Sequence, residues 1–319
     1  MKKILITGSN GLLGQKLVYN LIKRNDVQVI ATSSGENRLI EKEGYIFESL
    51  DITDYDAVEA IIERYHPSVI INTAAMTNVD ACEIKREECW KTNVTAVEYI
   101  VKALETVSAE VNTSSWQPET GAHVYEPHLI HLSTDFIFDG EKGSEYVETD
   151  LPNPLSYYAL SKWESEKTVQ KSSIKWAIAR TIIVYGIVDN MSRSNIVLWA
   201  KDALSKGQKI NVVDDQFRSP TLAEDLAEGC ILIADKKATG VYHLSGKETM
   251  SVLELVYYVA DFWKLDKSLV TPSKSNTLNQ AAKRPPRTGF NIDKAKKDLG
   301  YNPHSFMEGL AILDLQLKK

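Results

Sequence analysis

The stretch KILITGSNGLLG, residues 3–14, decides the fold. It begins with a short apolar run and continues with Gly8, Gly11 and Gly14, and an amphipathic stretch over 12–23 follows. A strand, a glycine turn and a helix in this order predict a dinucleotide-binding unit, because glycines let the backbone approach a pyrophosphate at the positive end of the helix. The G-x-x-G-x-x-G spacing differs from the G-x-G-x-x-G pattern, so this stretch alone leaves an ordinary glycine turn as the alternative.

Further apolar runs alternate with helical patterns along the first half of the chain. This alternation predicts an α/β fold, a Rossmann-type doubly wound parallel sheet with helices on both faces. In such folds, ligands bind beyond the carboxyl ends of the strands. The expected strands are Lys3–Thr7, Val27–Thr32, Tyr45–Leu50, Ser68–Asn72, Leu129–Ser133 and Lys175–Arg180, and the expected helices are 12–23, Asp54–Tyr65, Asn93–Ala109 and 156–170.

The alternation becomes less regular after Arg180, which predicts a smaller C-terminal substrate-binding lobe. We assign residues 1–185 to the dinucleotide-binding domain and 186–319 to this lobe, with about 222–244 returning to the first domain. The elements expected after Arg180 are helices over Asn195–Ser205, from Leu222 and from Ser251, and a strand near Val241–Leu244.

The segment Thr106–Pro127 is polar and rich in turn-forming residues, so we expect a long surface loop there. It enters the next strand at its amino end, opposite the expected ligand site. We therefore expect this segment to serve packing or partner contacts, not chemistry.

Composition excludes several classes of protein. Hydrophobic residues make up 43% of the chain and charged residues 25%, which is ordinary for a globular protein, and no apolar run is long enough to span a membrane. The net charge of −6 gives no electrostatic support for general nucleic-acid binding. The cysteines, Cys82, Cys89 and Cys230, form no C-x-x-C pair, so we expect reduced thiols in a cytoplasmic protein.

The end of the second expected strand bears on the choice of cofactor. An acidic side chain there would bind the ribose 2′-hydroxyl of NAD. This chain has Ser33, Ser34 and Arg38 instead, which suit a 2′-phosphate. We therefore expect NADPH, with NADH tolerated, unless Arg38 is merely a solvated helix residue.

A tyrosine and a lysine in "SYYALSK" form the expected catalytic pair. Tyr158 and Lys162 are four residues apart and share a helix face, whereas Tyr157 points well round the helix. An ammonium beside a phenol favours the phenolate and lowers the tyrosine pKa, which suits proton transfer near neutral pH. Tyr19 and Lys23 have the same spacing but lie in the helix after the glycine turn, where Tyr19 is expected to pack or to face solvent.

Two hydroxyls strengthen the choice of Tyr158. Ser133 and Thr134 lie at the carboxyl end of the fifth expected strand, where a hydroxyl can polarise a substrate carbonyl as hydride arrives. Their alternative role is turn formation with Asp135.

Taken together, the motifs "GSNGLLG", "NTAAMTNVDACE", "STDFIFDG", "YALSK", "RTIIVYG", "DDQFRSPT" and "KRPPRTGF" span almost the whole chain. With them, the chain resembles the extended short-chain dehydrogenases/reductases, and more narrowly the dTDP-4-dehydrorhamnose reductases. The resemblance implies a catalytic set of Thr134, Tyr158 and Lys162, in which Tyr158 protonates the carbonyl oxygen and Lys162 holds the nicotinamide ribose. The other cofactor contacts that it implies are Gly8, Asn10, Gly11, Leu12, Leu13, Gly14, Asp51, Ile52, Ala74, Ala75 and Met76.

The same resemblance implies a nucleotide-linked 4-keto-6-deoxy sugar as substrate, with dTDP-4-dehydro-L-rhamnose first among the candidates. Phe136 stands where the family commonly has Tyr, and Ile183 where it commonly has Trp, so the identity of the sugar or base stays open. The substrate contacts implied are Val79, Ser133, Phe136 and Ile183, together with Arg218, Lys283, Arg284 and Arg287 as cations for the diphosphate; the last three have a solvated basic loop as their alternative.

Two other functions remain open. The regulatory beta subunit of methionine adenosyltransferase is similar to the same reductases and binds NADP and a partner enzyme. That subunit engages its partner through a C-terminal tail, whereas this chain stops at "LDLQLKK" soon after its last expected helix, so we favour the reductase. A reductase or epimerase of another nucleotide sugar is the second alternative. The family often forms homodimers, and we expect no metal site, since His128 and His131 lie on opposite faces of a strand.

Overall fold

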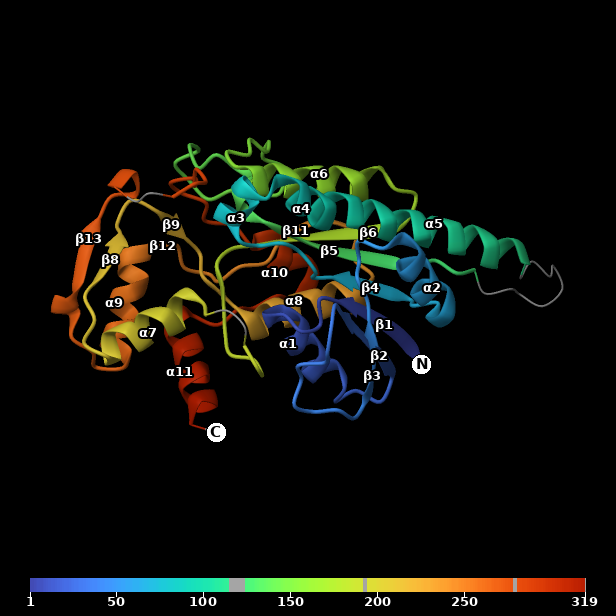
Figure 1. Cartoon of the computed structure of the whole chain (residues 1–319), viewed down its shortest axis with the longest axis horizontal. Coiled ribbons are helices and arrows are strands. Elements are labelled where there is room, and N and C mark those ends of the chain that lie inside the picture. The colour runs from blue at the N-terminus through green and yellow to red at the C-terminus, as the bar shows by residue number, and fades with distance from the viewer. Residues whose placement is uncertain (115–123, 192–193, 278–279, 319) are drawn as a thin grey trace.

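The computed structural model describes residues 1–114, 124–191, 194–277 and 280–318. Its centre is a seven-stranded sheet in the order β11-β6-β5-β4-β1-β2-β3, with every neighbouring pair parallel (Figure 1). The strands are β1 (Lys2–Thr7), β2 (Val27–Ser33), β3 (Tyr45–Ser49), β4 (Val69–Asn72), β5 (His128–Thr134), β6 (Lys175–Thr181) and β11 (Gly240–His243). The expected doubly wound fold is confirmed.

Helices cover both faces of this sheet (Figure 1). One apolar core lies between the sheet and α1 (Leu12–Leu21), α8 (Ala223–Lys236) and α10 (Asp293–Leu299). The other lies between the sheet and α2 (Tyr55–Tyr65), α5 (Ala96–Ser114) and α6 (Tyr157–Lys171). Short helices α3 (Val79–Ile84), α4 (Arg86–Trp90) and the π-helical turn η1 (Lys91–Thr95) lead into α5, and the 3-10 turn η2 (Asp135–Ile137) follows β5.

The C-terminal part has an apolar core of its own, at the left of Figure 1 and to one side of the central sheet. Strands β8 and β13 pair in parallel beside helices α7 and α9, and α11 packs against α9. The elements of this part are β7 (Val184–Tyr185), α7 (Ile196–Ser205), β8 (Ile210–Val213), β9 (Phe217–Arg218), β10 (Thr221–Leu222), β12 (Met250–Ser251), α9 (Val252–Phe262), η3 (Lys267–Leu269), β13 (Val270–Ser273), η4 (Ser275–Thr277) and α11 (Phe306–Leu317).

The expected loop Thr106–Pro127 is wrong over its first part, because α5 continues to Ser114. Val107 and Val111 extend the apolar stripe of α5 against the sheet, and this packing outweighs the polar composition. Residues 115–123 lie outside the described residues. Beyond them, Tyr125 exchanges two hydrogen bonds with the side chain of Asn112, at the amino end of β5. Within the described ranges, no helix is both long and apolar enough to cross a membrane.

Candidate active site

The order of the strands creates a crevice beyond the carboxyl ends of β1 and β4. The chain runs outward from β1 through β2 on one side and through β4 on the other, which is the switch point where ligands bind in such sheets. Two adjoining cavities of about 500 and 410 Å³ lie there and share Gly11, Thr73 and Ala75 as walls.

Most of the predicted site residues line these two cavities. The larger one is lined by residues predicted for catalysis, cofactor and substrate, namely Gly11, Leu12, Leu13, Gly14, Ala75, Val79, Ser133, Thr134, Phe136, Tyr158, Lys162 and Ile183. The smaller one is lined by residues predicted for the cofactor, namely Gly8, Asn10, Gly11, Ser33, Ser34, Arg38, Asp51, Ile52, Ala74 and Ala75. Sequence reasoning missed Thr73, Thr77 and Thr181, which also line the larger cavity.

The glycine turn is shaped for close approach of a ligand. Gly8 has φ +69°, and a Cβ at this position would lie 2.8 Å from the backbone nitrogen of Ala74. A Cβ on Gly14 would lie 2.3 Å from the carbonyl oxygen of Gly8. Helix α1 begins after Gly11 without a side-chain cap or an acidic residue in its first turn, so its first N–H groups and positive dipole end suit a pyrophosphate.

The smaller cavity ends at the loop after β2. Ser33, Ser34 and Arg38 lie at this end, and Arg38 is exposed. Asn10 fastens the loop, because its side chain donates to the carbonyl of Glu36 and accepts from the backbone N–H of Arg38. Arg38 lies outside any helix, so its alternative as a solvated helix residue does not hold.

The catalytic candidates meet at the other end of the crevice. Tyr158 and Lys162 face the larger cavity from α6, and Thr134 faces it from the end of β5. Tyr157 instead packs toward Trp90 and Arg86 on the outer side of α6. The helix-face argument therefore selects the tyrosine that lines the cavity. The other candidate, Tyr19, donates a hydrogen bond to Asp189.

Burial controls the electrostatics of this pair. Tyr158 is 9% exposed, and its burial raises its pKa above the ordinary value, an effect opposed by a hydrogen bond with Thr134. Lys162 is 3% exposed, and burial lowers its pKa to about 8. The expected lowering of the tyrosine pKa is therefore wrong for this structure, because desolvation of the phenolate dominates. A raised pKa keeps Tyr158 protonated at neutral pH, as a proton donor requires.

Thr134 is held by the carboxylate beside it. Its hydroxyl donates to Asp135 Oδ1 at 3.1 Å and accepts from the backbone N–H of Phe136. Ser133 differs, since its buried Oγ has no hydrogen-bond partner within the described residues. The O–H group of Ser133 is therefore available to donate a hydrogen bond to a ligand in the cavity.

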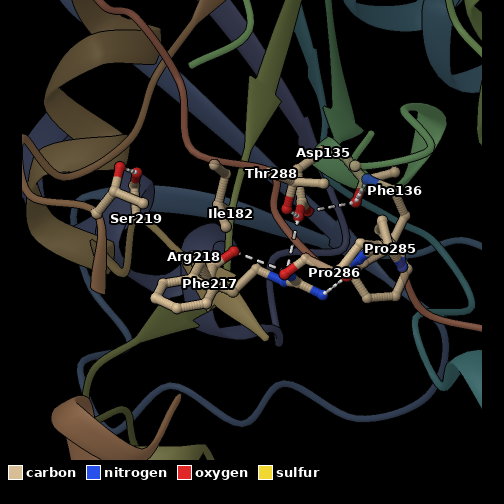
Figure 2. A network of polar contacts seen from close by, with 12 residues as sticks. Asp135, Phe136, Ile182, Phe217, Arg218, Ser219, Pro285, Pro286 and Thr288 are labelled. Carbon is tan, nitrogen blue, oxygen red and sulfur yellow. Dashed lines mark hydrogen bonds and ion pairs between the residues drawn. The ribbon is translucent and has the colours of Figure 1, made fainter. Parts of the chain in front are cut away.

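Asp135 is the centre of a buried network (Figure 2). The hydroxyl of Thr288 donates to its carboxylate, and Arg218 Nε lies 3.7 Å from Asp135 Oδ2. Arg218 also donates to the carbonyls of Pro285, at 2.6 Å, and Pro286, at 3.2 Å. The predicted diphosphate cation Arg218 is thus 2% exposed and joins β9 to the loop 283–288, while the ring of Phe136 lies over its guanidinium.

The other predicted cations lie in this loop. Arg284 forms a two-point ion pair with Asp80 of α3, at 3.1 and 2.7 Å. Arg287 is half-buried, stacks over Phe217, and its Nε has no hydrogen-bond partner within the described residues. Lys283 is exposed. Of the four predicted diphosphate cations, Arg287 and Lys283 therefore have the most N–H groups available to donate hydrogen bonds to a ligand.

The substrate side of the cavity carries the two residues that depart from the family pattern. Phe136 packs edge-on against Tyr158, with ring centroids 6.1 Å apart. Ile183 has φ +31°, a strained conformation for a β-branched residue, and its carbonyl accepts from the N–H of Thr221. Met76, predicted as a cofactor contact, packs in the apolar cluster beneath Tyr158, and Asn93 holds its backbone through two hydrogen bonds.

The RmlD substrate binding domain family matches residues 1–116 and 119–316 of this chain. The chain belongs to this family. A dTDP-4-dehydrorhamnose reductase of Aggregatibacter actinomycetemcomitans is 30% identical, with 97% of each chain covered. The methionine adenosyltransferase 2 subunit beta of Danio rerio is also 30% identical, over 89% of this chain and 81% of the relative. The resemblance to the reductases is confirmed, and with it membership of the NAD(P)-dependent oxidoreductases.

Solved structures agree with this assignment. A dTDP-4-dehydrorhamnose reductase of Clostridium acetobutylicum superposes with a TM-score of 0.83 at 28% identity, covering 99% of this chain and all of the other. The reductase of Bacillus anthracis, in complex with NADP, gives a TM-score of 0.80 at 25% identity with the same coverage. A dTDP-glucose 4,6-dehydratase of Bacillus anthracis, at 16% identity, shares the fold alone.

Proposed function

We propose that the protein reduces the 4-keto group of a nucleotide-linked 6-deoxy sugar with NADPH, converting dTDP-4-dehydro-L-rhamnose to dTDP-L-rhamnose. The observation that carries the proposal is the meeting of Thr134, Tyr158 and Lys162 with the glycine turn at one crevice. Similarity to dTDP-4-dehydrorhamnose reductases along almost the whole chain supports it.

The residues of the crevice fit a nicotinamide dinucleotide. The uncapped start of α1 would hold the pyrophosphate, while Asp51 and Ile52 border the pocket for the adenine. Lys162 would bind the nicotinamide ribose. When bound, the cofactor supplies the hydride. We propose NADPH over NADH because Arg38, Ser33 and Ser34 lie together at one end of the smaller cavity, where their cation and hydroxyls suit a 2′-phosphate.

The chain itself supplies the proton and the orientation of the carbonyl. Tyr158, kept protonated by burial, donates its phenolic proton to the carbonyl oxygen as negative charge develops there. We assign a hydrogen bond to the same oxygen to the hydroxyl of Ser133, which has no hydrogen-bond partner among the described residues. Thr134 lies beside the phenol and is oriented by Asp135, to which its hydroxyl donates.

We assign the sugar nucleotide to the space between this crevice and the C-terminal lobe, so that 1–185 with about 222–244 serves the cofactor and the rest of 186–319 the substrate. Val79, Phe136 and Ile183 line the larger cavity and are the proposed sugar contacts. Arg287 and Lys283 are the proposed diphosphate contacts, and a homodimer is the proposed assembly.

A regulatory role is the second candidate, since methionine adenosyltransferase 2 subunit beta sequences match at a similar identity. One experiment separates the two. The purified protein is mixed with NADPH and dTDP-4-dehydro-L-rhamnose, and with a methionine adenosyltransferase in a parallel co-purification. Loss of NADPH absorbance without a complex supports the reductase, and a complex without turnover supports the regulatory subunit.

A further inference from the structure

The loop that carries Arg38 is held by residues from a distant part of the chain. Residues 187–191, between β7 and α7, contact this loop, and we call them the strap. The side chain of Asn190 donates to the carbonyl of Arg38 at 2.9 Å, and the carboxylate of Asp189 accepts from the backbone N–H of Ile40 at 2.8 Å. Among the described residues, those that line the two cavities include neither Asp189 nor Asn190.

The conformation of this loop depends on side chains from elsewhere. Between β2 and β3 the chain forms no helix or strand, so other groups must satisfy its backbone. Asn10 accepts from the N–H of Arg38 at 2.9 Å, and Asn190 donates to the carbonyl of the same residue. The side chain of the next residue, Leu39, is fully buried in the core. The backbone of Arg38 is therefore fixed from two sides, by the glycine turn and by the strap.

Helix α1 fixes the position of the strap. The side chain of Gln15 is fully buried, and it accepts from the N–H of Asp189 at 2.9 Å and donates to the carbonyl of Asp189 at 3.0 Å. Tyr19, four residues further along α1, donates to the carboxylate of Asp189. Burial, together with this hydrogen bond, raises the pKa of Tyr19 to about 12, so its hydroxyl remains a donor at neutral pH. Asp189 is therefore bound to one face of α1 through both its backbone and its side chain.

A held loop favours recognition of a phosphate. Arg38 and Ser34 are exposed, so packing of their own side chains does little to orient them. If the loop were free, it would have to become ordered when the cofactor binds, and this ordering would reduce the binding free energy. NADH has no 2′-phosphate, so an effect that passes through the guanidinium of Arg38 should concern NADPH alone.

We propose that Asp189 and Asn190 are positioning residues that hold Arg38 for the 2′-phosphate of NADPH, so that a segment beyond β7 sets the preference for the cofactor. Both residues act through the backbone of residues 38–40 and not by contact with the cofactor. This inference deepens the proposed function and rests on its assignment of Arg38 to the 2′-phosphate.

The test uses variants of the full chain and the dissociation constants of NADPH and NADH, measured by nucleotide fluorescence. Asn190→Gly removes the amide and keeps the backbone unstrained, because Asn190 has φ +46°. Asp189→Ala removes the carboxylate, and Asp189→Asn restores an oxygen that can accept from Tyr19 and Ile40. Lys237→Gly is the matched control, since Lys237 is exposed, has φ +50° and lies at the end of α8.

For Asn190→Gly and Asp189→Ala we expect the dissociation constant of NADPH to rise about 5- to 20-fold, while that of NADH changes less than about two-fold. Asp189→Asn should recover most of the affinity for NADPH, and Lys237→Gly should bind both nucleotides like the unmodified chain. A general loss of structure would weaken both nucleotides. Losses of equal size for NADPH and NADH, or no loss for either, would overturn the proposal.

A double-variant cycle tests whether the strap acts through Arg38. Arg38→Ala lacks the guanidinium, so adding Asn190→Gly to it should weaken NADPH binding by less than about a further two-fold. A larger further loss would mean that the strap supports NADPH binding by another route, which overturns the proposal.

The same measurements separate failure of this inference from failure of the proposed function. If the unmodified chain binds NADH as tightly as NADPH, the proposed cofactor fails and this inference fails with it. If the unmodified chain prefers NADPH and the strap variants keep that preference, this inference alone fails. If dTDP-4-dehydro-L-rhamnose is not reduced, the proposed substrate fails, while the dissociation constants still test the strap.

Discussion

Arg218 Nε lies 3.7 Å from Asp135 Oδ2, and this buried ion pair joins β9 to the residue that follows β5 (Figure 2). Asp135 in turn accepts the proton of the Thr134 hydroxyl. The guanidinium also holds the carbonyls of Pro285 and Pro286. The orientation of Thr134 and the position of the loop are therefore coupled through one side chain.

Arg218→Met should destabilise the protein by about 3–5 kcal/mol, because it leaves the carboxylate of Asp135 buried without its cation. Urea unfolding measures this change. The double variant Arg218→Met with Asp135→Asn should recover much of the loss, since no unpaired charge remains. Lys206→Met breaks only an exposed pair with Asp202 and should cost less than about 1 kcal/mol. Equal stability of Arg218→Met and Lys206→Met would show that the buried pair contributes nothing.

Tyr158→Phe should lower kcat by about 10²- to 10⁴-fold, because the proton donor is removed while the ring that packs on Phe136 remains. The dissociation constant of NADPH should change little. Tyr157→Phe is the matched control, since Tyr157 points toward Trp90 and Arg86 and should keep most of the activity. A similar loss in both variants would contradict the assignment of the two faces of α6.

Lys162→Met should abolish turnover and raise the free energy of unfolding at pH 7 by up to about 3 kcal/mol, because it removes a buried charge. Burial lowers the pKa of Lys162 from 10.5 to about 8, so below pH 8 the folded chain bears the cost of a buried charge. Between pH 8 and 10.5 the unfolded chain binds more protons, and stability of the unmodified protein rises with pH.

The increase in the free energy of unfolding caused by Lys162→Met should therefore become smaller as the pH approaches 10.5. Urea unfolding at a series of pH values measures this change. Lys297→Met, at an exposed site on α10, should leave stability unchanged at every pH. A gain that does not depend on pH would mean that desolvation of the ammonium is not its cause.

Combining Arg38→Ala with Ser34→Asp should reverse the preference for the cofactor. The change removes the cation and adds a charge that repels a 2′-phosphate, so kcat/KM with NADPH should fall about 10- to 100-fold relative to that with NADH. Lys23→Ala, another exposed cation near the start of the chain, serves as control. An unchanged ratio would place recognition of the ribose phosphate elsewhere.

The parts of the site that depend on residues close together in the chain could be predicted from the sequence. The strand, glycine turn and helix over 3–23 and the shared face of Tyr158 and Lys162 depend on residues close together in the chain, and the structure has both arrangements. The end of helix α5 was predicted wrongly, because the Ser, Asn and Thr residues near it are typical of loops. In the structure Val107 and Val111 continue to pack on the sheet.

Contacts between distant segments could not be read in this way. Arg218 was predicted to face an anionic substrate, but it turns inward to carbonyls of Pro285 and Pro286, 67 and 68 residues further along the chain. His131 contacts Lys162 only because α6 packs on β5. No local sequence pattern predicts either contact, because each depends on how elements that are distant in the chain pack together.

The most direct test of the account is the decrease in NADPH absorbance when the protein meets dTDP-4-dehydro-L-rhamnose, compared between the unmodified chain and Tyr158→Phe. The account predicts rapid oxidation of NADPH, with dTDP-L-rhamnose as product, that is lost in Tyr158→Phe. Bound NADPH that is not oxidised, or oxidation that is equally fast in Tyr158→Phe, would contradict it.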